Sequence, residues 1–295
     1  MTMGRDGGMP PRWSRRQWLG TAAAAGWPWA LHAQPPAPSK PRLVTVSGAI
    51  TEAVYALGAE AQLVGTDTSS LYPEAALRTP KVGYMRQLSA EGVLSLRPDA
   101  VIATTEAGPP VVLDQLRSAG VRVELVKSEY TWNDVGAKVH AVGRAAGREA
   151  AASELMAKLD AEWAQLGRDV SASKGAKPRV LFILSHGPSP QVAGEGTAAD
   201  AMIRFAGGVN ALSGFRNYRP MTAEAMASAA PDVILTTDQG IEALGGIEKF
   251  WLRPELSLTP AFRQRALISQ DALLLLGFGP RTPQSVRDIH SRLYV

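Results

Sequence analysis

The sequence predicts an α/β fold of two similar Rossmann-like lobes with parallel sheets, joined by a long α-helix, with a ligand cleft between the lobes. Three observations support this fold class. Short β-branched runs alternate with amphipathic stretches, which is the pattern of parallel sheets covered by helices. A block of the first half recurs in the second half, and a stretch almost free of helix breakers separates the halves. A chain of 295 residues is long enough for two lobes that each bury a core.

The N-terminal 33 residues have the features of an export signal. Paired arginines, Arg15 and Arg16, precede an apolar run and a Pro-rich stretch, 34–41, that we interpret as a flexible leader. A basic start, a short apolar core and small residues before a breaker are typical of signal peptides, and the paired arginines resemble a twin-arginine signal. The apolar run is shorter than the about 20 residues that a spanning helix needs. We therefore predict a twin-arginine-type signal peptide over 1–33, rather than a disordered basic tail, and a soluble periplasmic protein after its removal.

The composition excludes several classes of function. The chain has no cysteine, so disulfides, thiolate nucleophiles and Cys-ligated metal clusters are ruled out. The signal region holds most of the net charge of +4, and the nearly neutral remainder gives no basic surface for nucleic acid. The sequence has no G-x-S-x-G, Walker or H-E-x-x-H motif, and its four histidines lack metal-ligand spacing. We therefore predict neither an enzyme nor a nucleic-acid-binding protein.

The N-terminal lobe is predicted over 42–148. Its first helix carries Ile50, Val54 and Leu57 on one face, and Gly58 ends it. The strands are expected at 43–46, 63–65, 100–103 and 121–125, and the helices at 50–57 and 112–118.

The connecting helix is predicted over 149–170 and the C-terminal lobe over 171–295. Leu155, Leu159 and Trp163 lie on one narrow apolar stripe of that helix. A helix of this length spans about 30 Å and resists opening of the lobes better than paired loops would. The alternative is an ordinary surface helix inside one domain. In the C-terminal lobe we expect strands at 179–184, 233–235 and 272–276 and a helix at 200–205.

The repeated block covers 89–102 and again 222–235. Each copy starts with a Ser or Thr helix cap and an early acidic residue, Glu91 or Glu224, and continues through Pro-Asp into a β-branched strand. Two lobes related by a pseudo-twofold axis and facing each other across a cleft are the natural hypothesis. The alternative is that a short helix, Pro-Asp and a strand form a common local device of α/β proteins.

Two residues are candidates for the cleft from their position in the chain. His186 follows the strand at 179–184, and loops at the carboxyl ends of parallel strands hold the ligands of α/β proteins. Tyr84 lies in a loop just before the capped helix of the first repeat copy. Taken alone, a tyrosine in a loop is more often structural than functional.

The segment around this tyrosine carries a family resemblance. Residues 82–94 read Val-Gly-Tyr-Met-Arg-Gln-Leu-Ser-Ala-Glu-Gly-Val-Leu, which is similar to the signature of periplasmic haem-binding proteins of ABC importers. These proteins belong with the cobalamin and siderophore binders, whose two lobes are joined by a long helix. Segments 46–52, 65–73 and 276–283 agree, so the resemblance covers essentially all of 42–295.

The resemblance implies that Tyr84 is the axial ligand of ferric iron in haem b, the transported ligand. Ferric iron is a hard Lewis acid and phenolate oxygen a hard donor, and tyrosinate is an established haem ligand. The phenolate needs a nearby cation, for which Arg86 and Arg281 are the candidates, and Arg281 is the better one because it follows a rigid Gly-Pro loop. Segment 236–240 departs from the family pattern, because it offers Asp and Gln where a second-lobe cation is expected.

Further contacts follow from the same resemblance. The haem propionates could take hydroxyl and amide hydrogen bonds from Thr68 and Ser69, while Gly108 and Pro109 offer an apolar wall.

The resemblance also gives the repeated acids a role. In the superfamily one Glu on each lobe docks to arginines of the permease, and the matching residues are Glu91 and Glu224. Their symmetric placement suits an inner-membrane ABC permease dimer with its ATPase. The alternative is that each acid only interacts favourably with its helix dipole. The predicted function is capture of ferric haem in the periplasm and its delivery to this importer; a cobalamin or ferric-siderophore binder, or an exported enzyme, are the alternatives.

Overall fold

The computed structural model describes residues 8, 40–185 and 190–294. Apart from Gly8, the predicted signal peptide lies outside these residues, as do most of the leader and His186.

The N-terminal lobe is built on a parallel sheet in the order β2-β1-β5-β6. Alternate residues of its strands point to opposite faces: Leu43 and Ile102 pack with α1 and α4, whereas Val44 and Val101 pack with α2 and α3. Both faces are therefore covered, as parallel sheets require. The strands are β1 (Leu43–Val46), β2 (Leu63–Thr66), β5 (Ala100–Thr104) and β6 (Arg122–Val126), and the helices are α1 (Gly48–Ala56), α2 (Ala90–Ser95), α3 (Pro110–Ser118) and α4 (Trp132–Ala146).

Shorter elements complete this lobe. The hairpin of β3 (Gly83–Tyr84) and β4 (Gln87–Leu88) precedes α2, and the 3-10 turns η1 (Glu60–Gln62) and η2 (Glu74–Arg78) flank β2.

The C-terminal lobe has a mixed sheet in the order β10-β8-β7-β11-β12, with β9 pairing one end of β7. Strands β9, β7, β11 and β12 run parallel, and β8 and β10 extend the sheet in antiparallel fashion. The strands are β7 (Arg179–Leu184), β8 (Gln191–Ala193), β9 (Val209–Asn210), β10 (Tyr218–Pro220), β11 (Val233–Thr237) and β12 (Leu267–Gln270). The helical elements are α6 (Ala198–Phe205), α7 (Ala223–Ala229), α8 (Asp238–Ala243), α9 (Ile247–Trp251), η3 (Pro254–Leu256), α10 (Pro260–Gln264), α11 (Ala272–Leu276) and α12 (Thr282–Leu293).

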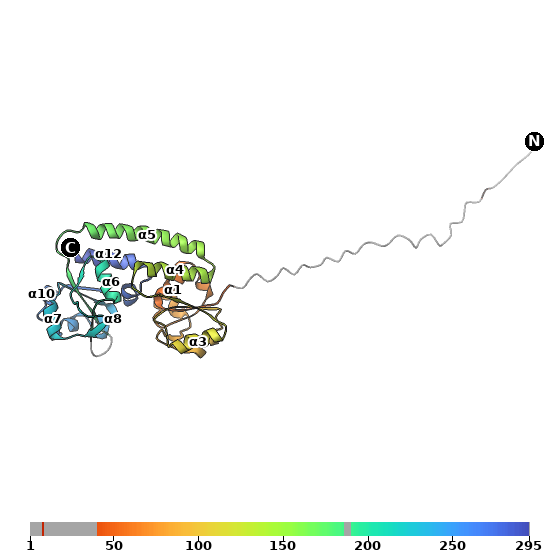
Figure 1. The fold of residues 1–295 in the computed structure, drawn as a ribbon, viewed down its shortest axis with the longest axis horizontal. Coiled ribbons are helices and arrows are strands. Elements are labelled where there is room, and N and C mark those ends of the chain that lie inside the picture. The colour runs from red at the N-terminus through yellow and green to blue at the C-terminus, as the bar shows by residue number, and fades with distance from the viewer. Residues whose placement is uncertain (1–7, 9–39, 186–189, 295) are drawn as a thin grey trace, which may run out of the picture. The chain divides into compact units, whose positions relative to one another are not determined.

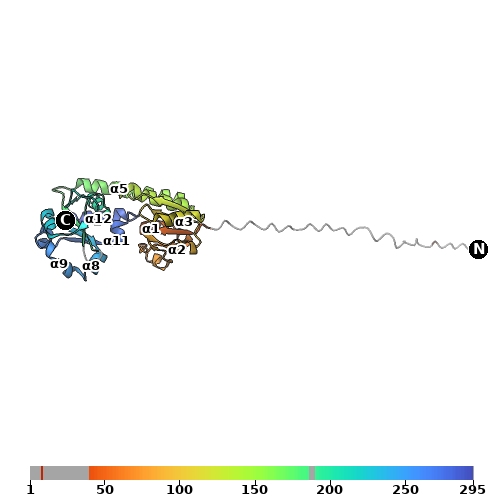
Figure 2. The same cartoon turned by 60° about the horizontal axis from the view of Figure 1, so that its bottom comes forward.

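The long helix α5 (Glu149–Ala172) runs from one lobe to the other, alongside α4 and then α12 (Figures 1 and 2). Leu159 packs in the core of the N-terminal lobe, while Leu166 packs in the core of the C-terminal lobe. The predicted fold class is therefore confirmed. Within the described residues, no helix combines the length and the apolar character needed to cross a membrane.

One predicted element is wrong. Residues 272–276 form helix α11, and the strand of this region is β12, a few residues earlier. Five consecutive apolar residues suit a buried strand and a buried helical turn equally well. The residue that decides is Asp271, whose Oδ1 accepts a hydrogen bond from the backbone N–H of Leu274, 2.9 Å away, and so caps the helix.

The repeat predicted from the sequence forms the same local structure in both lobes. Ser89 caps α2 and Thr222 caps α7, each by accepting a hydrogen bond from a backbone N–H three residues on. The aspartate of each Pro-Asp then accepts the backbone N–H of an arginine at or just before the neighbouring strand, and that arginine's side chain donates to carbonyls at the C-terminal end of the short helix. The two sets are Arg42 with Asp99, and Arg179 with Asp232.

Candidate ligand-binding cleft

A cavity of about 440 Å3 lies between residues of the two lobes. In the N-terminal lobe its lining comes from the segments that follow β1, β2, β5 and β6, from the β3–β4 hairpin and from α4. In the C-terminal lobe it comes from α8, α11 and the residue after α11. The carboxyl ends of parallel strands are where α/β proteins bind ligands. Its size is typical of small-molecule sites.

Tyr84 lines this cavity and is 42% exposed. It ends β3, where the pairing of Tyr84 with Gln87 makes a tight hairpin. The turn between these strands contains Arg86, whose Nη1 donates to the Tyr84 hydroxyl across 3.4 Å. The hairpin is held by Gly108, because Gly108 N–H donates to the Met85 carbonyl. The structure therefore presents a phenol oxygen beside a guanidinium at the cavity wall.

A carboxylate completes this group. Glu106 Oε1 accepts a hydrogen bond from Arg86 Nη2 at 2.9 Å and another from the Tyr130 hydroxyl at 3.1 Å. Burial and the negative charge of Glu106 raise the pKa of Tyr130 well above its usual value, so this phenol stays protonated. Burial alone would lower the pKa of Arg86, but Glu106 together with Tyr84 and Tyr130 outweighs it, and the net direction is upward. Both donors therefore keep their protons at neutral pH.

A buried aspartate shapes the loop after β2. Asp67 accepts hydrogen bonds from the hydroxyls of Ser69 and Ser70, and from the backbone N–H of Ser47 and Ser69. The Thr68 N–H donates to the carbonyl of Gly83, which ties this loop to the tyrosine's hairpin. Asp67 thus fixes the loop that closes one side of the cavity.

Lys138 is a buried cation at the base of the cavity, 3% exposed. It lies on α4, and its Nζ donates to the backbone carbonyls of Gly277 at 3.2 Å and Phe278 at 2.9 Å in the other lobe. Burial lowers the pKa of Lys138 to about 8, an effect that Asp134, Glu106 and Glu52 only partly oppose. A charged group thus bridges the lobes next to the ligand space.

The C-terminal lobe offers a different surface to the same cavity. Leu273 and Leu276 of α11 line it with Ala272, and Leu273 comes so near Gly48 that a Cβ there would lie 2.7 Å from it. The polar contribution is Gln239, whose amide is already bonded to Asp271 and to the backbone N–H of Ala272. One wall is therefore mainly apolar, and the facing wall carries the phenol and the charges.

Comparison with known proteins identifies the family. Residues 43–272 match the family described as periplasmic binding protein. The chain belongs to this family. Its members bind solutes and are not enzymes, which confirms the prediction that this protein has no catalytic activity.

Three known proteins that are similar to this periplasmic binding protein have the following identities and coverage. The periplasmic haem-binding protein BhuT, solved with two haems, is 45% identical, with a TM-score of 0.83 over 87% of this chain and 98% of that chain. The ABC transporter substrate-binding lipoprotein YvrC of Bacillus subtilis is 28% identical over 86% of this chain and 80% of its own length. The cobalamin-binding protein of Halobacterium salinarum is 30% identical over 66% of this chain but only 53% of its own length.

The structure brings some of the residues predicted for the ligand site together and separates others. Tyr84 and Ser69 line the cavity, and Arg86 contacts Tyr84. The hydroxyl proton of Ser69 is already donated to Asp67, at 2.6 Å, so it is not free for a propionate. Thr68 is exposed.

Gly108, Pro109 and Arg281 lie outside the lining that the described residues form. Gly108 is buried behind the Tyr84 hairpin and Pro109 precedes α3.

Arg281 is engaged elsewhere. Its guanidinium forms an ion pair with Glu52 at 2.9 Å, and its backbone N–H donates to the same carboxylate. Its Cζ lies 3.4 Å from the ring centroid of Tyr72. The cation that accompanies the Tyr84 hydroxyl in the structure is therefore Arg86, although the sequence favoured Arg281. A contact between Arg281 and the ligand stays a prediction.

Sequence reasoning missed Glu106, Tyr130, Lys138 and Leu273. A signal for two of them was present, because Glu106 follows β5 and Tyr130 follows β6, at the strand ends where ligands bind. Lys138 lies within a helix and Leu273 within the segment predicted as a strand, so neither position indicated the cleft.

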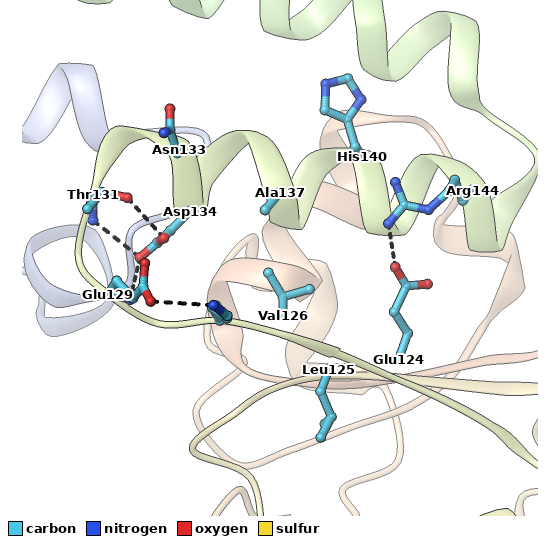
Figure 3. Close-up of a pocket in the computed structure, with 11 residues that line it drawn as sticks. Glu124, Leu125, Val126, Glu129, Thr131, Asn133, Asp134, Ala137, His140 and Arg144 are labelled. Atoms are coloured by element: carbon cyan, nitrogen blue, oxygen red, sulfur yellow. Dashed lines mark hydrogen bonds and ion pairs between the residues drawn. The ribbon is translucent and has the colours of Figure 1, made fainter.

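A second pocket, of about 610 Å3, lies between β6 and α4 and shares no lining residue with the cleft (Figure 3). It is lined by one lobe, with His140 on α4 and an ion pair between Arg144 and Glu124 at its edge. Within the part of the chain that the structure describes, no three His, Asp or Glu side chains are grouped to hold a metal ion. Unlike the cleft, this pocket is lined by residues of the N-terminal lobe alone.

Proposed function

We propose that this protein is an exported, monomeric haem-binding protein that captures ferric haem between its lobes and delivers it to an inner-membrane ABC importer. The observation that supports it best is the phenol of Tyr84 at the wall of an interlobe cavity, beside the guanidinium of Arg86. The 45% identity to a haem-binding protein over nearly all of that protein's length points the same way.

Tyr84 is the proposed axial ligand of the iron. A phenolate is a hard donor that suits ferric iron. In such a complex the hydroxyl proton is replaced by the iron, and Arg86 Nη1, which lies 3.4 Å from the Tyr84 oxygen, would remain a hydrogen-bond donor to it. Leu273 and Leu276 provide apolar contacts for a flat, largely apolar ring system.

The remaining site residues stay part of the proposal. Thr68 offers an exposed hydroxyl for a propionate, while Ser69 lines the cavity with its hydroxyl proton held by Asp67. Gly108 and Pro109 would contribute a wall next to this lining, and Arg281 would bind a propionate in place of Glu52. His186 stays a candidate ligand contact from its position in the sequence, shortly after the strand 179–184, and lies outside the described residues.

Delivery is proposed to use Glu91 and Glu224. Both are exposed and both lie in the first turn of a short helix in the repeated block. A symmetric permease dimer with its ATPase would meet one acid on each lobe. The paired arginines of the N-terminal region support export by a twin-arginine signal.

The test is titration of the purified protein with hemin, followed by absorption spectroscopy, in parallel with the Tyr84→Phe variant. Because the substitution removes one half-exposed hydroxyl, we expect an unchanged unfolding midpoint and an affinity for hemin weaker by about tenfold or more. A shifted Soret band in the wild type supports haem as the ligand. Equal affinities would remove Tyr84 as the iron ligand.

The same titration separates haem from cobalamin. A cobalamin binder would retain cyanocobalamin after gel filtration and produce no shifted Soret band with hemin. That pair of results would overturn the proposal as a whole.

A further inference from the structure

Glu106 connects three groups around the proposed ligand. Its Oε1 accepts hydrogen bonds from Arg86 Nη2 and from the Tyr130 hydroxyl, while the other arm of Arg86 reaches Tyr84. Glu106 follows β5 and Tyr130 follows the adjacent strand β6, so the two neighbouring strand ends converge on the hairpin of Tyr84. A single carboxylate oxygen thus holds the guanidinium that faces the phenol.

The backbone at Tyr130 shows that this arrangement is imposed by its surroundings. Tyr130 has φ of 57°, in the left-handed region that bulky residues rarely adopt. Its ring packs against Phe278, with centroids 5.5 Å apart, and Phe278 has φ of 54° as well. Backbone strain of this kind persists only where packing over-determines it, and it concentrates at functional sites. The Tyr130 hydroxyl is therefore fixed in a direction that suits Glu106.

Arg86 needs such a partner, because its side chain is 57% exposed. An exposed arginine samples many rotamers, and fixing it when a ligand arrives costs affinity. A guanidinium already held by a carboxylate is in place before binding.

We propose that Glu106 is a positioning residue for ligand binding, which holds the Arg86 guanidinium at the Tyr84 oxygen and is itself fixed by Tyr130. The consequence for affinity rests on the proposed haem-binding function, while the effect on the position of Arg86 does not.

The first experiment is the crystal structure of the ligand-free Glu106→Ala and Glu106→Gln variants. In Glu106→Ala we expect the Arg86 guanidinium to leave the Tyr84 hydroxyl, and in Glu106→Gln the amide oxygen accepts from Arg86 and keeps it there. An unmoved Arg86 in Glu106→Ala would overturn the proposal, whatever the ligand is.

The second experiment is a double-mutant cycle of hemin affinity. Arg86→Ala and Glu106→Ala should each weaken hemin binding by about tenfold. The double variant should lose no more than either single variant, because Glu106 acts on binding only through Arg86. Glu106→Gln should stay within about threefold of the wild type. Additive losses, or equal losses in Glu106→Ala and Glu106→Gln, contradict positioning.

The chain offers a matched control. Arg144 and Glu124 form a pair of the same kind in the same lobe, with the same sequence separation, at the second pocket (Figure 3). Glu124→Ala should leave hemin affinity unchanged. If the wild type binds no hemin at all, the proposed function fails while the crystal structures still decide whether Glu106 positions Arg86.

Discussion

The two lobes share a framework but not a binding surface. In each, an aspartate and an arginine lock a short capped helix to a strand, Asp99 with Arg42 in one and Asp232 with Arg179 in the other. At the cleft the N-terminal lobe carries Tyr84 and its charged neighbours, whereas the C-terminal lobe carries leucines. The repeated sequence therefore specifies the scaffold, and the loops outside the repeat specify the ligand chemistry.

Further contacts join the two lobes, and neither lobe could make them alone. Trp132 of α4 stacks on Trp163 of α5, with centroids 4.6 Å apart, and Trp163 packs edge-on against Phe205 of α6. Polar bonds from Glu52 and Lys138 cross from the N-terminal lobe to the segment around α11 and α12.

The largest effect, a loss of stability, is expected at the ion pair between Glu52 and Arg281 that joins the lobes. Glu52 is almost fully buried and accepts hydrogen bonds from the backbone N–H and the side chain of Arg281. Removing one partner of a buried pair leaves the other charge without compensation, which costs about 3–5 kcal/mol. Glu52→Ala should lower the free energy of unfolding by that order, measured by urea denaturation.

The control for this experiment is Glu162→Ala. Glu162 of α5 pairs with Arg287 of α12 at 3.9 Å, and both side chains are about half exposed. Exposed pairs contribute about 0–1 kcal/mol, so this variant should unfold at nearly the wild-type midpoint. Equal losses in the two variants would show that the buried pair has no special part in joining the lobes.

The second prediction concerns Lys138, which also joins the lobes, and the pH dependence of the free energy of unfolding that it causes. Because the pKa of Lys138 is about 8 in the folded protein and 10.5 when unfolded, the unfolded chain binds more protons between these values. The cost of burying the charge is present below pH 8 and is relieved as the pH rises. From pH 8 to 10 Lys138 should contribute a gain of about 2 kcal/mol in the free energy of unfolding.

Lys138→Gln removes this titration while keeping N–H donors for the carbonyls of Gly277 and Phe278. The variant should therefore gain less stability than the wild type between pH 8 and 10, in urea denaturation at several pH values. Lys158→Gln is the control, because Lys158 is exposed on α5 and pairs only with Glu154 among the partners that the structure describes. Parallel curves for the wild type and Lys138→Gln would contradict the assigned role of Lys138.

Much of the fold could be predicted because local patterns agree with the final structure. The β-branched runs at β1, β5, β7 and β11 became strands, and the narrow apolar stripe became α5. At α11 the pattern was ambiguous, since five apolar residues fit either period, and the capping role of Asp271 decided it.

The site could be predicted only where its residues are close in sequence. Tyr84 and Arg86 lie on one hairpin, so a motif contains both. Glu106 and Tyr130 join them through strand order, and Lys138 through packing of a helix against the other lobe. Arg281 seemed free in the sequence because its partner, Glu52, is in the opposite half of the chain.

The smallest effect of a single substitution is expected in the repeated block, where the two lobes are most alike. Glu91 and Glu224 are exposed, and each exposed ion pair with a permease arginine is worth about 1 kcal/mol or less. Haem uptake by the importer reconstituted in vesicles should fall a few-fold with Glu91→Ala or Glu224→Ala alone, and further in the double variant, because the proposed docking places one acid on each permease subunit. Hemin affinity should not change, since both acids lie outside the cavity lining that the described residues form. Wild-type uptake by the double variant would reduce both acids to partners of their helix dipoles, and a loss confined to one single variant would mean that the permease distinguishes the lobes.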